Sequence, residues 1–344
     1  MIRDENGFIL IAVLWLLVAI AAVGLDAGLR GRTERLAVAN SVDDSRARAA
    51  AYAGAEYARS RLTAAMLARA DELRAQVAEQ SRNARGGGRG NTRTQSVERL
   101  FRSADPMEDP WRDPSGLLMD QISLGDSNFR LQVRDTGAAV NLNQADEEML
   151  RNFFAQGIGL DFTDADRITQ AVLDWRDEDE IPRVGGGERE AYLDAGLPVL
   201  PPNRLFASLD ELRFVLGMTP EAFEAATPHL TLIGSGRINV NAAPEAVLLA
   251  VPGMTPGLAG ELIRNRESGY FPRNNDEFLE MVPAAVTGSG RQAERQLQAR
   301  ITFATNEVEI LSEGWVEGSP VSSLVHLVVS RASEGALVVW RRVE

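Results

Sequence analysis

The sequence of 344 residues contains no cysteine and no lysine, and it has only two histidines. Without cysteine, the chain has no disulfide framework, no thiolate metal site and no cysteine nucleophile. The Gly-x-Ser-x-Gly, P-loop and HExxH motifs are also missing. Because no residue pattern supports catalysis, we expect that the protein is not an enzyme.

Positive charge is in the minority, since 36 arginines face 49 acidic residues and give a formal net charge of −13. This balance argues against broad, phosphate-driven binding of nucleic acid. It suits cations or basic partners instead. The length suggests two folded units with connecting elements.

A long apolar run stands close to the N-terminus, from Phe8 to Leu25, and its eighteen residues carry no charge. This is close to the length that a helix needs to cross a bilayer. Only MIRDENG precedes it, which is shorter than the start of a secretory signal, and no small-residue cleavage site follows. A plain single-pass anchor is the simplest interpretation.

The Gly7-Phe8 junction favours another interpretation. A short polar leader that ends in Gly, followed by Phe and an apolar helix, resembles the signal of type IV pilin-like proteins. In that family a membrane peptidase cleaves after the Gly on the cytoplasmic side and methylates the new amino terminus, here Phe8. This orientation places the C-terminal part in the periplasm, although Arg30, Arg32 and Arg35 behind the run point the other way by the positive-inside rule.

The fifth residue after the junction is Ala12, where most pilin-like proteins carry Glu. A carboxylate at membrane depth costs several kcal/mol and is kept only where it meets a partner. The missing Glu is therefore either a departure from the pilin pattern or the mark of a subunit that has no neighbour above it.

The stretch 29–82 is rich in Ala, Arg, Glu and Leu and contains no proline, which predicts a long helix. An apolar stripe with steps of seven and four runs along it, formed by Ala55, Leu62, Met66, Leu73 and Val77. Regular heptads are not sustained, so the stripe favours packing against a sheet over a coiled coil. The Gly-rich run 86–90 is expected to end the helix.

Strand character follows at 121–124 and 129–134, with a turn at 125–128 between them. From about residue 143 to 300 the chain reads as short helices punctuated by Pro and Gly. Strand character returns at 308–310, 314–317, 324–329 and 336–343. This order predicts an α+β protein whose antiparallel sheet is interrupted by a large inserted α-helical domain.

The insert shows internal similarity, because VNLN at 140–143 resembles part of INVNAAPEAVLL, and GMTP occurs at 217–220 and 253–256. The second GMTP segment resembles the helix-hairpin-helix of DNA-uptake and repair proteins, where two glycines let backbone N–H groups approach a phosphate. Thr255 occupies the second glycine position, and the surroundings are not basic. We therefore interpret these hairpins as packing units rather than a DNA-binding site.

The densest chemical signal is DWRDEDEIPRVGGGEREAY, which begins at Asp174. Asp177, Asp179 and Glu188 stand at positions 1, 3 and 12 of an EF-hand count, but Ile181 and Pro182 occupy positions 5 and 6, so the match is partial. Oxygen ligands without cysteine or clustered histidine favour calcium, and the glycines allow Glu188 to return toward the aspartates. A solvated acidic loop is the alternative.

The leader, DWRDEDEIPR with GGGEREAY, PPNRLFASLDELRFVLGMTP and RINVNAAPEAVL, in this order, resemble the K-type minor pseudopilins of bacterial type II secretion systems over nearly the whole chain. The resemblance implies a pseudopilin fold split by an α-domain, Ca²⁺ bound in that domain, and a tip complex with the I-type and J-type minor pseudopilins. Carried over by position, Asp177, Asp179 and Glu188 would be ligands, and Asn203 would be a further candidate.

These observations predict a division of the chain into six segments. They are a leader at 1–7, a transmembrane helix at 8–27, its periplasmic continuation at 28–82, a linker with the first part of the pseudopilin sheet at 83–140, the inserted α-domain at 141–300, and the closing strands at 301–344.

The predicted function is that of a minor pseudopilin that caps the pseudopilus tip and helps to start its assembly, for protein export across the outer membrane. It would cross the bacterial inner membrane once, be cut by the prepilin peptidase between Gly7 and Phe8, work with other secretion-system components, and bind no nucleic acid. One alternative is a membrane-tethered helix-hairpin-helix protein that binds DNA for uptake. Another is an anchored scaffold without pilin chemistry.

Overall fold

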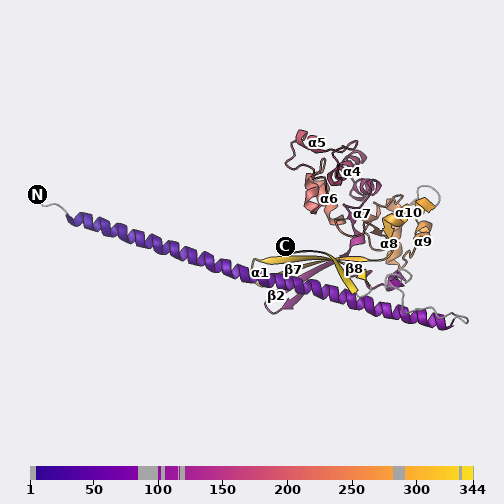
Figure 1. The fold of residues 1–344 in the computed structure, drawn as a ribbon, viewed down its shortest axis with the longest axis horizontal. Helices are drawn as coiled ribbons and strands as arrows, with labels where there is room; N and C mark the ends of the chain where they lie inside the picture. The colour runs from indigo at the N-terminus through magenta and orange to yellow at the C-terminus, as the bar shows by residue number, and fades with distance from the viewer. Residues whose placement is uncertain are drawn as a thin grey trace.

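The computed structural model describes residues 5–83, 100–101, 105–114, 116, 121–281, 291–332 and 335–343. A long helix with a packed sheet forms a stem, and a second domain lies to one side of it (Figure 1). The predicted α+β class with an antiparallel sheet is confirmed. The Gly-rich run 86–90 lies outside the described residues.

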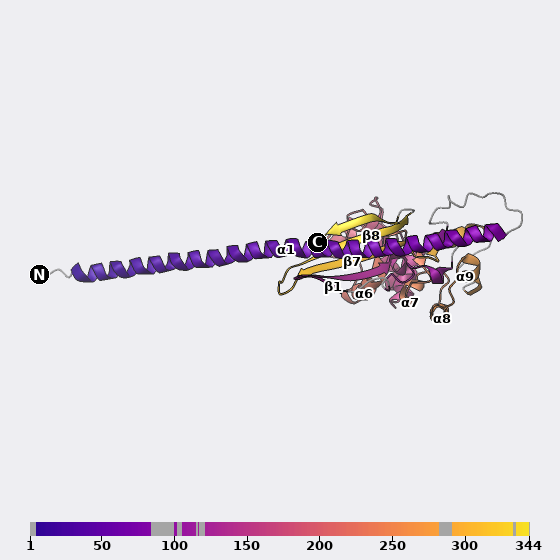
Figure 2. The ribbon, with the colours of Figure 1, turned by 90° about the horizontal axis from the view of Figure 1, so that it is seen from below.

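The stem helix α1 extends over 79 residues, Glu5–Asn83, which corresponds to about 120 Å at the rise of an α-helix. Its N-terminal half projects from the remainder of the molecule as a shaft, whereas its C-terminal half lies along the sheet (Figures 1 and 2). The described apolar side chains of the shaft, such as Trp15, are exposed. The long helix is therefore partnered along only part of its length.

The sheet of the stem has five strands in the order β1-β2-β7-β8-β9, and all neighbours are antiparallel. The strands are β1 Gln121–Leu124, β2 Ser127–Asp135, β7 Glu307–Val316, β8 Ser322–Ala332 and β9 Gly335–Val343. The β1–β2 turn is tighter than we expected, because Leu124 pairs with Ser127 and only Gly125 and Asp126 connect them. Gly125 has φ +70°, which suits such a two-residue turn. The two segments expected at 308–310 and 314–317 form the single strand β7.

The apolar stripe of α1 packs on one face of this sheet, as predicted. Ala55, Leu62 and Met66 are fully buried and share a core with strand residues such as Phe129 and Ile310. The helix approaches the sheet so closely that a Cβ on Gly314 would lie 2.2 Å from the Ala47 carbonyl oxygen. Small residues on both surfaces therefore set the separation between helix and sheet.

The insert connects β2 to β7 and has a hydrophobic core of its own, which runs from Val140 to Ile301. Its helices and helical turns are α3 Glu147–Asn152, η5 Phe153–Gly157, α4 Phe162–Arg176, α5 Arg189–Asp194, η6 Leu209–Phe214, α6 Pro220–Ala226, η7 Thr227–His229, α7 Glu245–Leu248, α8 Pro256–Glu267, α9 Asn275–Met281 and α10 Arg291–Arg300. A further short turn, η2 Pro106–Glu108, belongs to the stem.

Two short parallel ladders, absent from our expectations, divide the insert into two units. The first joins β3 Val140–Asn141 to β4 Leu230–Thr231, and the second joins β5 Ile238–Asn239 to β6 Ile301–Thr302. Two-residue strands have too little alternation to be recognised in a sequence. Each ladder closes one unit of the insert.

The two units repeat the same polar contacts, and Ile238–Asn241 of the second unit is equivalent to VNLN at 140–143 of the first. In the first unit, Arg176 donates to the carbonyls of Leu142 and Ala145. In the second, Arg266 donates to the carbonyls of Val240 and Ala243. The similarity between VNLN and INVN in the sequence therefore reflects a repeated structural arrangement.

Both units contact the stem, the first where Arg134 of β2 donates to the Leu230 carbonyl at 3.2 Å, but most of the first unit lies farther out than the second (Figure 1). Arg273 forms an ion pair with Asp105 at 3.4 Å, and the Arg112 guanidinium lies 5.2 Å from the centre of the Phe271 ring. Figure 1 shows α8 and α9 beside the end of the stem and α4 and α5 at the far side of the insert. The acidic segment that follows α4 is therefore carried at the outer side of the molecule.

Candidate metal centre

The acidic loop begins where α4 ends, and Asp174 fixes its course. The Asp174 side chain is fully buried, and its Oδ2 accepts the backbone N–H groups of Arg183 at 3.1 Å and Gly187 at 2.8 Å. A Cβ on Gly186 would lie 2.3 Å from the same oxygen. The glycine run therefore lets both arms of the loop close over one carboxylate, and burial raises the pKa of Asp174.

Aromatic side chains hold the base of the loop. Trp175 stacks on Phe206 with ring centres 5.7 Å apart and contacts Tyr192 at 5.9 Å. The Tyr192 hydroxyl accepts the backbone N–H of Leu216 at 3.1 Å. Trp175 and Tyr192 are fully or almost fully buried, so the loop is attached to the core of the first unit.

Three predicted ligand residues converge in this loop. Carboxylate oxygens of Asp177, Asp179 and Glu188 all lie within 4.8 Å of one another. Glu188 is buried, Asp177 is half-buried and Asp179 is exposed. By contrast, the nearby Glu178, Glu180 and Glu190 are exposed and lie outside this cluster.

Asn203 approaches the cluster from a separate segment. It has φ +48°, and it is the one residue besides glycine with a positive φ in the described part of the chain. Its side-chain amide donates to the Asp179 carbonyl, while its Oδ1 is buried and lacks a hydrogen-bond partner. A backbone held in this uncommon conformation indicates that the position of the side chain matters.

Four side-chain oxygen atoms of the cluster are buried without a hydrogen bond. They are Asp177 Oδ1, both carboxylate oxygens of Glu188, and Asn203 Oδ1. Glu188 stands at the N-cap of α5 yet makes no side-chain cap bond. Burial, together with the charges of Asp174, Asp177 and Asp179, raises the pKa of Glu188 to about 7. Buried acceptors without donors are costly, so the arrangement fits a bound cation.

The donor set is oxygen throughout, from three carboxylates and one amide, which is the preference of a hard cation. The site needs further oxygens to complete the six to eight that Ca²⁺ takes, and water supplies them in many such sites. Arg183 lies 3.7 Å from Asp177 Oδ2 and is the nearest cationic side chain among the ion pairs of this cluster. It balances part of the negative charge without reaching the unpartnered oxygens.

The stem and insert together define a long helix packed on an antiparallel sheet that is split by an inserted α-domain. A sequence model described as type II secretion system (T2SS), protein K, matches residues 130–235. Type II secretion system protein K of Dickeya chrysanthemi is 29% identical over 147 residues, covering 41% of this chain and 40% of that one. The protein of the same description from Pectobacterium carotovorum is 29% identical over 148 residues, covering 38% of this chain and 45% of its own length.

The fold is also similar to a chain in the crystal structure of the GspK-GspI-GspJ complex from enterotoxigenic Escherichia coli. The TM-score is 0.50 at 17% identity, and the alignment covers 80% of this chain and 94% of that chain. The chain is therefore similar, over part of its length, to type II secretion system protein K. The aligned region covers less than half the length of the two curated relatives.

The membrane predictions concern residues that are described only in part. Residues 1–4 lie outside the described structure, as do the side chains of 5–12 and 22–33. In the portion that is described, no helix is both long and apolar enough to qualify as a membrane span. Cleavage between Gly7 and Phe8 and the span at 8–27 remain predictions.

Proposed function

We propose that this chain caps the tip of the secretion pseudopilus as a minor pseudopilin and helps to start its assembly. The observation that carries the proposal is the insert, a second domain with a core of its own on the part of the stem that lies away from the shaft (Figure 1). Such bulk leaves the shaft free to pack against subunits below, while it obstructs a subunit above.

The shaft supplies the contact with the subunits below. Exposed apolar side chains cover its described N-terminal part, among them Leu14, Trp15 and Leu16. Apolar surface of this extent on a helix indicates a membrane or a protein partner. Ala12 in place of Glu agrees with a subunit that offers no carboxylate to a neighbour above it.

The proposed partners are the I-type and J-type minor pseudopilins, since the similar solved chain comes from a GspK-GspI-GspJ complex. The proposed place is the inner membrane before assembly, with one span and the head in the periplasm. The prepilin peptidase would cut after Gly7 and methylate Phe8. A Gly7→Val chain should then keep its leader, and mass spectrometry of the N-terminus would reveal normal processing if the assignment were wrong.

The absence of cysteine allows a direct test of the tip position. A Val184→Cys chain carries one thiol on a side chain that is 96% exposed. Maleimide-gold applied to sheared pseudopili should then mark a single end of each filament. Labels along the filament would contradict a cap, and the cysteine-free parent controls for non-specific labelling.

For the acidic loop we propose a Ca²⁺ site formed by Asp177, Asp179, Glu188 and Asn203. Its support is the set of buried oxygens without donors. A bound cation would join the loop to the segment that carries Asn203 and so stabilise the outer unit of the insert. Chelation should lower the melting temperature of the purified chain in calcium buffer, and an unchanged melting curve would count against the site.

A further inference from the structure

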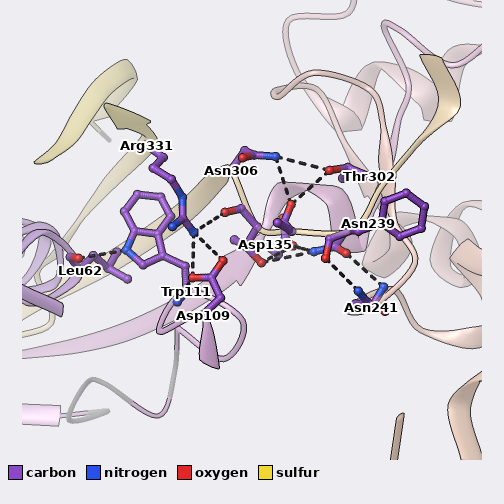
Figure 3. Close-up of polar contacts among 12 residues, drawn as sticks. Leu62, Asp109, Trp111, Asp135, Asn239, Asn241, Thr302, Asn306 and Arg331 are labelled. Atoms are coloured by element: carbon purple, nitrogen blue, oxygen red, sulfur yellow. Dashed lines mark hydrogen bonds and ion pairs between the residues drawn. The ribbon is translucent and has the colours of Figure 1, made fainter. Parts of the chain in front are cut away.

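The chain crosses between stem and insert twice, and a buried carboxylate lies where the two crossings meet. The first crossing leaves β2 at Asp135, and the second returns through Thr305 to β7. Asp135 is only 5% exposed. Figure 3 shows its side chain among polar groups from both domains.

Three donors bind this carboxylate. Asp135 Oδ2 accepts the Asn239 side-chain amide at 2.6 Å and the Thr305 hydroxyl at 2.7 Å, and Oδ1 accepts the backbone N–H of Gly137 at 2.8 Å. Asn239 belongs to β5 of the insert, while Thr305 lies on the returning crossing. One side chain at the end of a stem strand therefore connects both crossings to the second unit.

A neighbouring ion pair attaches the returning crossing to the stem. The Arg331 guanidinium donates to both oxygens of Asp109, at 2.9 and 2.8 Å, and to the Thr305 carbonyl at 2.8 Å. It lies 4.8 Å from the centre of the Trp111 ring, and the Trp111 indole donates to the Leu62 carbonyl of α1 at 3.0 Å. The charge of Asp109 is thus compensated by an arginine.

Asp135 differs, because none of the ion pairs in the described structure includes it. The charged groups on the elements packed around it include Asp109 from the stem loop, Arg331 from β8, Glu307 at the start of β7, and Arg237, which precedes β5. Next to Asp135, Arg134 of β2 and Glu309 of β7 form an ion pair with each other. The negative charge of Asp109 repels a charged Asp135 carboxylate. Arg331 forms its ion pair with Asp109 and not with Asp135. The Glu307 carboxylate accepts a hydrogen bond from the Ser235 backbone N–H.

Burial raises the pKa of Asp135 from 3.8 to about 6, although its three hydrogen bonds act in the opposite direction. If the junction opens, water reaches the carboxyl and its pKa returns toward the ordinary value. The closed junction therefore holds the proton more tightly than the open one, so protonation favours closure and loss of the proton favours opening. The Thr305 hydroxyl can serve either form, because it both donates and accepts.

We propose that Asp135, Asn239 and Thr305 form a proton-sensitive latch that holds the insert against the stem when the carboxyl is protonated and loosens when it is charged. The latch would make the angle between the two domains depend on the pH of the compartment.

Spin labels on a cysteine pair can test the latch in the full chain. Ala49 on α1 and Ala225 on α6 are exposed, and the absence of native cysteine makes Ala49→Cys with Ala225→Cys specific. Pulsed dipolar spectroscopy should give one narrow distance at pH 4.5. The ratio of open to closed chains should rise by up to about tenfold per pH unit toward pH 6 and then level off.

Asp135→Asn in the labelled chain should abolish this pH response, because the side chain can no longer ionise. Asp126→Asn is the matched control, since Asp126 is an exposed carboxylate at the β1–β2 turn, and it should leave the response intact. A pH-independent distance in the parent, or an unchanged response in Asp135→Asn, overturns the latch. If Asp135→Asn does not fold, Thr305→Val serves as a second test. It removes a hydrogen-bond donor to the charged carboxylate, so the pH midpoint of the change in distance should move to higher pH. An unmoved midpoint overturns the latch as well.

Discussion

At the scale of single residues, Glu188 in the first unit of the insert is the carboxylate whose charged form is opposed both by burial and by neighbouring aspartates. Its carboxylate is buried beside three aspartates, and neither of its oxygens has a hydrogen-bond donor. The raised pKa, about 7, means that the cation-free folded chain binds a proton that the unfolded chain has lost. The stability of the cation-free chain therefore falls as the pH rises from about 4.5 to about 7.

Calcium affinity should consequently increase with pH, because the cation competes with that proton. Between pH 6 and pH 8 we expect the affinity to rise about tenfold, as the fraction of ionised Glu188 grows around a pKa of about 7. Isothermal titration calorimetry at the two pH values measures this directly. Glu188→Gln should lose both the affinity and its pH dependence, while the exposed Glu190→Gln should keep both.

Asn203 offers a second test that separates backbone from side chain. Asn203→Ala removes the amide oxygen and also puts alanine, which tolerates the left-handed region less well than asparagine, at φ +48°, which we expect to cost about 1 kcal/mol. Asn203→Gly removes the oxygen but tolerates that backbone. Both variants should bind calcium more weakly, and urea unfolding with chelator should show a larger loss of stability for Ala than for Gly, since both lose the hydrogen bond to the Asp179 carbonyl. Unaltered calcium binding by both would remove Asn203 from the ligand set.

At the scale of elements, the contact between α1 and the sheet depends on the short distance between their backbones, which small side chains permit. The buried surface of the helix includes Ala47, Ala51, Ala55 and Ala58, all fully buried. Opposite them, Gly314 of β7 leaves no room for a β-carbon. Dispersion between closely packed backbones therefore holds the helix on the sheet.

Gly314→Ala should destabilise the stem by about 1–3 kcal/mol, as overpacking does, because the new methyl group would overlap backbone atoms of Ala47 and Ala51. Gly257→Ala is a suitable control, since that position in α8 has nothing nearer than 4.0 Å and a helix gains from alanine. Urea unfolding followed by circular dichroism distinguishes the two. Equal stability of Gly314→Ala and the parent would show that the helix can shift at no cost.

At the scale of the whole molecule, two cores lie side by side and share few side chains. The stem core consists of α1, the five-stranded sheet and the loop with Trp111, whereas the insert core contains only residues from 140 to 301. Since β2 and β7 are adjacent and antiparallel, with Asp135 opposite Val308, the insert occupies the position of a hairpin loop.

Replacing residues 137–306 by an Asn-Gly turn should therefore leave a stem that folds. Its two neighbouring strands are already in the register that a hairpin needs. We expect the strand and helix signals in circular dichroism to persist and the unfolding transition to remain cooperative. In a secreting cell this shortened subunit should lose the capping property while it still enters filaments. Retained capping would assign that role to the shaft.

Much of this architecture was readable from the sequence because it depends on local pattern. The stripe at Ala55, Leu62 and Met66 predicted a helix on a sheet, and the alternation in 129–134 predicted a strand. The aspartates at 177 and 179 are close in sequence, so their grouping was evident. Asn203 could not be inferred from spacing and came from family resemblance alone, since a separate segment brings it to the site.

By itself, the sequence determined the long helix, the antiparallel sheet and its interruption by an α-domain, since periodicity and the placing of Gly and Pro encode these locally. Only the tertiary structure decided that the insert repeats one set of polar contacts in two units and that the second unit lies against the stem loop. It alone showed that Asp135 is buried at the crossing. The burial of Asp135 depends on contacts between residues more than a hundred positions apart, with Asn239 and Thr305, which no local pattern records.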